Sequence, residues 1–230
     1  MKPSQFLGFL AVLLTLAGAA GCKSAATIAA NAQFRVMNAS AEQPSLTFLL
    51  TASTVAADLA YPTASAYASE GPGGYTVHVE PSGTTTKLIN QPVVFQSGIP
   101  YTFIAAQSAF ASPALTPIFL TDDNTAPASG QMRLRVVNAS PDVGNLDVYV
   151  VSPGTNIQAA NPTFTNLAFT SASTYQNLVA GKYEVFFTAP GQKTVLIDSG
   201  VFSLGQGQVR TVVALDSTGG FATSLLADLN

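Results

Sequence analysis

The stretch "LRVVNASPD" at residues 134–142 has a counterpart one hundred residues earlier, "FRVMNASAE" at residues 34–42. Both copies open with apolar residues that favour β-strands and then reach Asn-Ala-Ser. Asn and Ser side chains bond nearby backbone groups, so they favour a turn where a strand ends. Each stretch therefore predicts a strand followed by a turn, and the repetition predicts two copies of one module.

Further matches extend the repeat through most of the chain. They pair residues 46–50 with 146–150, Tyr67 with Tyr175, residues 75–77 with 183–185, and "IFLTDDN" (118–124) with "SLLADLN" (224–230). Each copy consists of short runs rich in Val, Tyr, Phe, Thr and Ile, separated by Gly, Pro, Asn or Ser. No helical periodicity is visible after the N-terminal region. This pattern is typical of a small β-sandwich.

The sequence thus predicts an all-β protein with two tandem immunoglobulin-like β-sandwich domains after an N-terminal signal helix. We expect the first domain at residues 33–121 and the second at residues 132–230. Residues 122–131 between them are polar, contain Pro127 and Gly130, and lack apolar alternation, as a linker does.

Alternation along the strands predicts which side chains face the core. In "LDVYV" we expect Leu146, Val148 and Val150 to point inward, and Asp147 and Tyr149 to point outward.

Three strand aromatics, Tyr101, Tyr149 and Phe186, could lie on outer faces. We expect them to form the contact between the two modules, with binding of a sugar or protein partner as the alternative.

The N-terminal region has the features of a secretion signal and of a lipid attachment site. Residues 1–22 combine Lys2 with an apolar run and small residues, as a signal peptide does, and the run is too short for a spanning helix of about 20 residues. The stretch "LAGAAGC" resembles a bacterial lipobox, with Ala19 where Leu is usual. The resemblance implies cleavage before Cys22 and a lipid on that residue. An ordinary secretory cleavage nearby is the alternative.

Two further expectations follow from the lipobox. Residues 23–32 have no strand or turn pattern and are interpreted as a tether. Lys23, where Asp would favour retention in the inner membrane, implies the outer membrane.

Composition excludes several classes of function. Only 9% of the 230 residues are charged, the net charge is −3, and the nine basic residues form no run, which argues against nucleic-acid binding. The chain has one histidine and one cysteine, so an internal disulfide is impossible and an ordinary zinc site is excluded. We predict no cofactor and no metal.

The residues also suggest a family. "RVVNASPDVGNLDVYV" at 135–150 resembles the opening of the DUF4397 domain, which is found in bacterial secreted and cell-surface proteins. The first copy departs from that phrase at Ala41, Glu42 and Thr47. The resemblance implies a β-sandwich on the cell exterior and no established chemistry.

Polar groups that could carry chemistry are few. Calcium needs about 6–8 oxygen ligands, and the pairs Asp142 with Asp147 and Asp122 with Asp123 are thin candidates. His78 lies mid-strand and is interpreted as packing or exposed surface.

The sequence therefore predicts no catalytic residue. The expected function is a non-catalytic lipoprotein of the bacterial cell envelope, a binding or structural module whose partner is an envelope protein or a glycan. Two alternatives stay open. One is a glycan-active or other enzyme that uses carboxylates such as Glu70, Glu80 and Glu184. The other is an accessory subunit of an envelope complex that pairs through an exposed edge strand.

Overall fold

The computed structural model describes residues 30–109 and 114–229. The expected signal helix, Cys22 and residues 23–29 of the expected tether lie outside these residues. Apart from one short 3-10 helix, η1 (Ile157–Ala159), the regular elements of the described residues are β-strands, so the all-β prediction is confirmed. Within the described residues no helix is long and apolar enough to cross a membrane.

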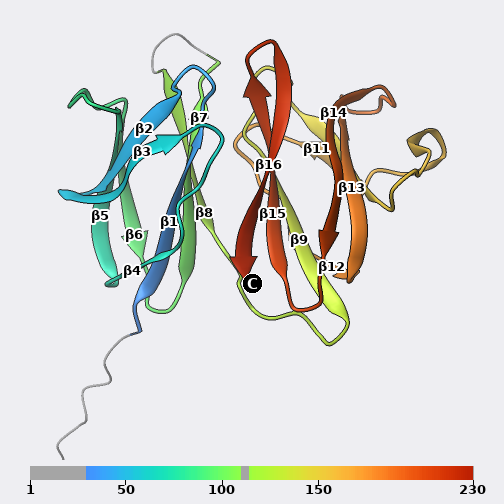
Figure 1. The fold of residues 1–230 in the computed structure, drawn as a ribbon, viewed down its shortest axis with the longest axis horizontal. Helices are drawn as coiled ribbons and strands as arrows, with labels where there is room; N and C mark the ends of the chain where they lie inside the picture. Colours follow the sequence, from blue (N-terminus) through green and yellow to red (C-terminus); the bar gives the residue numbers. More distant parts are fainter. Residues whose placement is uncertain (1–29, 110–113, 230) are drawn as a thin grey trace, which may run out of the picture.

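Two β-sandwiches lie side by side, each built from two four-stranded sheets (Figure 1). In the first, inner sheet 1 has the order β4-β1-β7-β8 and outer sheet 1 has the order β3-β2-β5-β6. The strand bounds are β1 (Ala32–Ala39), β2 (Ser45–Leu50), β3 (Ser53–Ala60), β4 (Ala68–Glu70), β5 (Gly73–Pro81), β6 (Ile89–Phe95), β7 (Pro100–Gln107) and β8 (Leu115–Thr121).

The second sandwich repeats this plan strand for strand. Inner sheet 2 has the order β12-β9-β15-β16 and outer sheet 2 has the order β11-β10-β13-β14. The strand bounds are β9 (Gln131–Asn138), β10 (Leu146–Val151), β11 (Phe164–Leu167), β12 (Gln176–Val179), β13 (Gly181–Thr188), β14 (Val195–Leu204), β15 (Val209–Ser217) and β16 (Gly220–Leu229). Even the unusual parallel pair β1–β7 recurs as β9–β15. The predicted internal repeat is confirmed.

Each sandwich encloses its own apolar core. Phe34, Phe48 and Phe103 are fully buried in the first, and Leu134 and Phe187 are buried in the second. Burial of such side chains contributes roughly 1.5–3 kcal/mol each, so each core is a main source of stability.

The Asn-Ala-Ser phrase forms the predicted turn in both copies. The Nδ2 group of Asn138 donates to the carbonyls of Gly144 at 2.7 Å and Leu167 at 3.1 Å, while its Oδ1 accepts the N–H of Ser140. Asn38 makes the equivalent three bonds in the first sandwich. The phrase therefore has a structural role, holding the end of the first strand.

The burial predicted for β10 is confirmed for the side chains that face the core and is wrong for those on the opposite face. Leu146 and Val148 are buried in the core as predicted, but Asp147 and Tyr149 are also buried. Strand β11 and the connection from β13 to β14 cover this face: the Asp147 carboxylate accepts backbone N–H groups from Asn166 and Gly191, each at 2.8 Å, and Lys193 lies over the Tyr149 ring. Strand alternation carries no information about segments that return to cover a sheet.

A third apolar core lies between the two inner sheets and joins the sandwiches. Its buried members are Met37, Ala39, Ile104, Ala106, Ile118, Val137, Ala139, Val213, Leu215 and Leu226. Strands β1 and β9 therefore bury both faces, one in their own sandwich and one against the other sandwich. The two sandwiches form a single body with a continuous interface.

The prediction that Tyr101, Tyr149 and Phe186 form the contact between the modules is wrong. Tyr101 belongs to the first core, where its ring stacks on Phe119 with centroids 5.2 Å apart. Tyr149 is buried on the outer side of outer sheet 2, and Phe186 is not in the shared core. Among the residues that the structure describes, Tyr61 and Phe169 are the aromatic side chains packed against the shared core, because the interface forms from the inner sheets.

Candidate functional site: the cleft between the sandwiches

A closed ring of six polar side chains lies in the interface between the inner sheets. Arg35 donates to Thr102 at 2.8 Å, Thr102 donates to Asp122 at 2.5 Å, and Asp122 accepts from Arg135 at 2.6 Å. The second half repeats the first: Arg135 donates to Thr211 at 3.1 Å, Thr211 donates to Asp228 at 2.6 Å, and Asp228 accepts from Arg35.

Each ion pair in the ring joins the two sandwiches. Arg35 lies on β1 and pairs with Asp228 on β16, whereas Arg135 lies on β9 and pairs with Asp122, which follows β8. The four charged side chains are at most 3% exposed. Burying a charge without an opposite partner destabilises a fold. Each sandwich therefore needs the arginine and the aspartate of the other sandwich to pair with its own buried charges.

Two tyrosines, Tyr67 and Tyr175, donate to the ring from outside. The Tyr67 hydroxyl donates to Asp122 at 2.6 Å and its ring lies under Arg35, whose Cζ is 4.5 Å from the ring centroid. Tyr175 does the same for Asp228 and Arg135. Burial, and then the neighbouring carboxylate, raise the pKa of both tyrosines well above their usual range. Both hydroxyls therefore stay protonated and act as donors.

The two ends of this symmetric ring differ, because one is covered by a connecting segment and the other is open. At one end Arg133 also lies over Tyr175 and donates to the carbonyls of Asp123 and Thr125, so the connection from β8 to β9 is held across it. The position equivalent to Arg133 in the first copy is Gln33. At the other end, around Arg35 and Tyr67, the structure has an open cleft.

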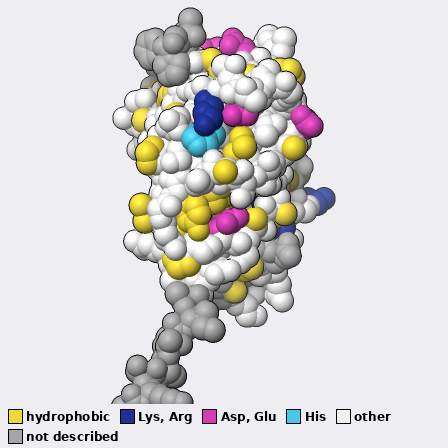
Figure 2. Space-filling view, turned by 90° about the vertical axis from the view of Figure 1, so that its left-hand side faces the viewer, with side chains coloured by type: hydrophobic (Ala, Val, Ile, Leu, Met, Phe, Trp, Pro, Cys, Tyr) yellow, Lys and Arg dark blue, Asp and Glu magenta, His cyan; other side chains and the backbone are white. Residues whose placement is uncertain are grey.

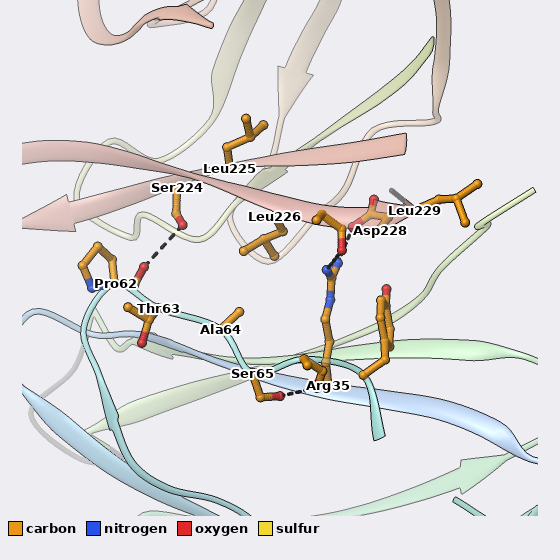
Figure 3. Close-up of a pocket in the computed structure, with 13 residues that line it drawn as sticks. Arg35, Pro62, Thr63, Ala64, Ser65, Ser224, Leu225, Leu226, Asp228 and Leu229 are labelled. Carbon is orange, nitrogen blue, oxygen red and sulfur yellow. Dashed lines mark hydrogen bonds and ion pairs between the residues drawn. The ribbon is translucent and has the colours of Figure 1, made fainter. Parts of the chain in front are cut away.

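This cleft has a volume of about 590 Å³ and lies between two short segments (Figure 3). One wall is formed by residues 62–67 of the first sandwich and the other by residues 224–229 of β16. Arg35 reaches across to Asp228, and the Ser224 hydroxyl donates to the carbonyl of Pro62 at 3.3 Å. The cleft is the candidate binding site because it combines volume, exposed backbone and mixed polar and apolar side chains.

A second polar cluster lies near the signature turn of the second sandwich. The Ser140 hydroxyl donates to one carboxyl oxygen of Asp216, and the other oxygen has no hydrogen-bond partner among the described residues. The Asp216 main-chain carbonyl accepts the Tyr61 hydroxyl at 2.6 Å. Burial, and then the Asp142 carboxylate, raise the pKa of Asp216.

This raised pKa predicts a pH effect on stability. A carboxyl whose folded-state pKa is raised contributes stability at low pH that is lost as the pH rises through that pKa. The melting temperature of the wild type minus that of Asp216→Asn should therefore grow more positive from pH 7 to pH 4. Asp123→Asn is the control: hydrogen bonding to Arg133 lowers the pKa of Asp123, so its melting-temperature difference should change little between pH 7 and pH 4 and should shrink only at lower pH. A difference for Asp216→Asn that is flat with pH would contradict the assignment.

The structure does not bring the predicted chemical candidates together. Asp147 caps backbone N–H groups, whereas the exposed Asp142 lies near Asp216. Asp122 and Asp123 each pair with an arginine. Within the described residues no group of three or more His, Cys, Asp or Glu side chains could hold a metal ion.

The carboxylates of the enzyme alternative lie on three different sheets. Glu70 is on β4 of inner sheet 1, Glu80 on β5 of outer sheet 1, and Glu184 on β13 of outer sheet 2. His78 lies on β5 and is partly buried, with Nδ1 lacking a partner among the described residues. Figure 2 shows this side of the molecule as mostly uncharged, with a few acidic and basic side chains set among polar and hydrophobic ones.

The charged members of the ring and the two tyrosines bound to it were not predicted, although the repeat contains a signal for them. The two arginines align at the same place in the repeated phrase, the two tyrosines align, and the two aspartates align in "IFLTDDN" and "SLLADLN". Identical polar residues at equivalent positions of the two copies could have indicated that they contact each other across the interface between the sandwiches.

Fold and site together define a protein of paired β-sandwiches that share a buried, reciprocal polar interface beside an open cleft. The chain belongs to the family described as a domain of unknown function (DUF4397), whose profile matches residues 32–149 and 151–230. The first matched segment includes the first sandwich, β9 and most of β10. The resemblance of residues 135–150 to the DUF4397 domain is confirmed.

Comparisons with individual proteins are less informative. No curated protein matches the chain. A family 41 carbohydrate-binding module from streptococcal virulence factors is 9% identical, with 83% of this chain and 95% of that chain covered and a TM-score of 0.29. A family 26 module from Eubacterium rectale Amy13K is 10% identical, with 84% and 96% covered and a TM-score of 0.28. The Bacillus anthracis TIE protein is 10% identical, with 84% and 34% covered and a TM-score of 0.27. Such scores support no inference about fold or ligand.

Proposed function

We propose that this chain is a non-catalytic lipoprotein of the bacterial cell envelope, anchored through Cys22 and serving as a binding or structural module. Its two domains, at residues 33–121 and 132–230, are in this proposal an immunoglobulin-like pair joined by the linker 122–131. The outer membrane is the proposed location, on the basis of Lys23. The partner is an envelope protein or a glycan.

The observation that supports a non-catalytic role is that the buried charged side chains of the ring are paired with each other. Arg35, Arg135, Asp122 and Asp228 are committed to each other across the interface. General acid–base catalysis requires a group placed to exchange a proton with substrate, and groups locked in ion pairs are poorly suited to it. The open cleft beside this buried interface supports binding.

Photo-crosslinking in intact cells tests the binding role. A photoreactive amino acid replaces Leu225 at the rim of the cleft or, as a matched control, Val94 on outer sheet 1; these side chains are 42% and 66% exposed. We expect a discrete adduct from position 225 and none from position 94. Adducts of equal yield at both positions, or none at 225, would contradict binding in the cleft.

A further inference from the structure

Strand β16 is an edge strand of inner sheet 2 among the described residues, and it borders the cleft. Its neighbour in the ladder is β15. Two carbonyls at this end of the strand accept arginine donors, Ala227 from Arg35 and Leu229 from Arg210, and the other edge groups include those of Leu225. Six consecutive residues of β16, 224–229, line the cleft, and residues 62–67 lie opposite. The cleft therefore runs along the edge of the strand (Figure 3). At about 3.4 Å per residue, six residues of strand span about 20 Å.

The direction of the edge groups follows from one contact. The carbonyl of Ala227 accepts the Nη1 donor of Arg35 at 2.7 Å, so it points out of the sheet and into the cleft. Successive residues of an antiparallel strand alternate in the side to which their backbone groups point. Leu225, two residues away, therefore directs its N–H and C=O to the same side.

The side chains of the cleft have few donors or acceptors to offer a ligand. The Tyr67 hydroxyl is bonded to Asp122, and the Ser65 hydroxyl donates to Ala66 while accepting the N–H of Val36. One face of the Tyr67 ring is covered by Arg35. Sugar binding relies on free polar side chains and open aromatic faces, whereas addition of a strand relies on backbone groups at an edge.

The neutral lining of the cleft and its position beside inner sheet 2 indicate which kind of ligand could bind there. Among the described residues two charged side chains line the cleft, Arg35 and Asp228, and they neutralise each other, so this lining offers a charged ligand no unpaired partner. A strand placed beside β16 would continue inner sheet 2 across residues 62–67. Inner sheet 2 already packs on inner sheet 1 through the shared apolar core, so the added strand would extend an interface that exists.

We propose that the cleft binds an extended, uncharged peptide segment of a partner protein, which pairs with β16 as a fifth strand of inner sheet 2. This inference rests on the binding role proposed above and specifies its ligand. Backbone hydrogen bonds would supply the affinity, and the small side chains of residues 63–66 would favour small or β-branched residues in the peptide.

The test uses the mature chain carrying Cys22→Ala and a panel of labelled, acetylated and amidated hexapeptides composed of Val, Thr, Ser and Ala. Leu225→Pro removes the edge N–H, and proline is tolerated on edge strands. Leu225→Thr keeps the N–H and changes only the side chain. We expect the best peptide to bind Leu225→Pro at least tenfold more weakly than wild type, and Leu225→Thr within threefold of wild type.

A scan of the peptide itself guards against misfolding of the proline variant. N-methylation at alternate amides should weaken binding to wild type at least tenfold, while methylation at the intervening amides should have little effect. Equal binding by Leu225→Pro, or no alternation in the scan, would overturn strand addition. Binding of maltohexaose or cellohexaose but of no peptide would make the ligand a glycan. Absence of peptide binding together with a crosslink from position 225 would overturn this inference and leave the binding role intact.

Discussion

An Arg135→Ala variant is expected to lose about 3–5 kcal/mol of unfolding free energy, because it leaves a buried carboxylate without its partner. Asp122, which accepts the 2.6 Å bond from Arg135, has a fully buried side chain. Arg135 also donates to Thr211 and to the carbonyl of Thr121. Denaturant unfolding followed by tyrosine fluorescence measures the loss.

Arg133→Ala is the matched control on the same strand. Arg133 bonds Asp123 at the same 2.6 Å, but the Asp123 side chain is 52% exposed. A pair with an exposed carboxylate contributes about 0–1 kcal/mol, so this variant should lose clearly less than Arg135→Ala. The double variant Arg135→Ala with Asp122→Ala should recover part of the loss, because it removes the orphaned charge. Equal losses for Arg133→Ala and Arg135→Ala would contradict the structural role of the ring.

Cys22→Ala should release the protein from the membrane almost completely. Each buried CH₂ of a lipid contributes about 0.8 kcal/mol, and stable anchoring takes more than one acyl chain. Nothing else in the proposal holds the protein at the membrane, so loss of the lipid removes the whole anchoring energy. Cell fractionation and immunoblotting measure the change.

Ser24→Ala is the control for this prediction, because it alters the neighbouring sequence and keeps the cysteine. It should stay with the membrane fraction, as the wild type should. Retention of Cys22→Ala in the membrane fraction after a high-salt wash would refute the lipid anchor.

The sequence predicted the repeat, the all-β class and the Asn-Ala-Ser turn because these depend on local properties. Apolar alternation reports one buried face, and Asn38 and Asn138 bond backbone groups in their own sandwich. The second buried face of β1 and β9 could not be predicted in this way. Met37 and Val137 are buried only because another sheet lies against them.

The candidate site was harder to predict for the same reason. Arg35 and Arg135 alternate with core residues and would be expected to face solvent, and Asp122 begins a polar run that resembles a linker. Their partners come from the other sandwich, 193 residues away in the case of Arg35 and Asp228. Only the arrangement of the two sandwiches turns four polar residues into two buried ion pairs.

The shared core and the two buried ion pairs make the two sandwiches one cooperative folding unit, which frames the cleft. Differential scanning calorimetry of the mature chain carrying Cys22→Ala tests this claim most directly. A shared apolar core and two buried ion pairs couple the sandwiches, so we predict a single transition whose calorimetric and van't Hoff enthalpies agree. Two separable transitions in the chain with an intact ring would contradict the claim.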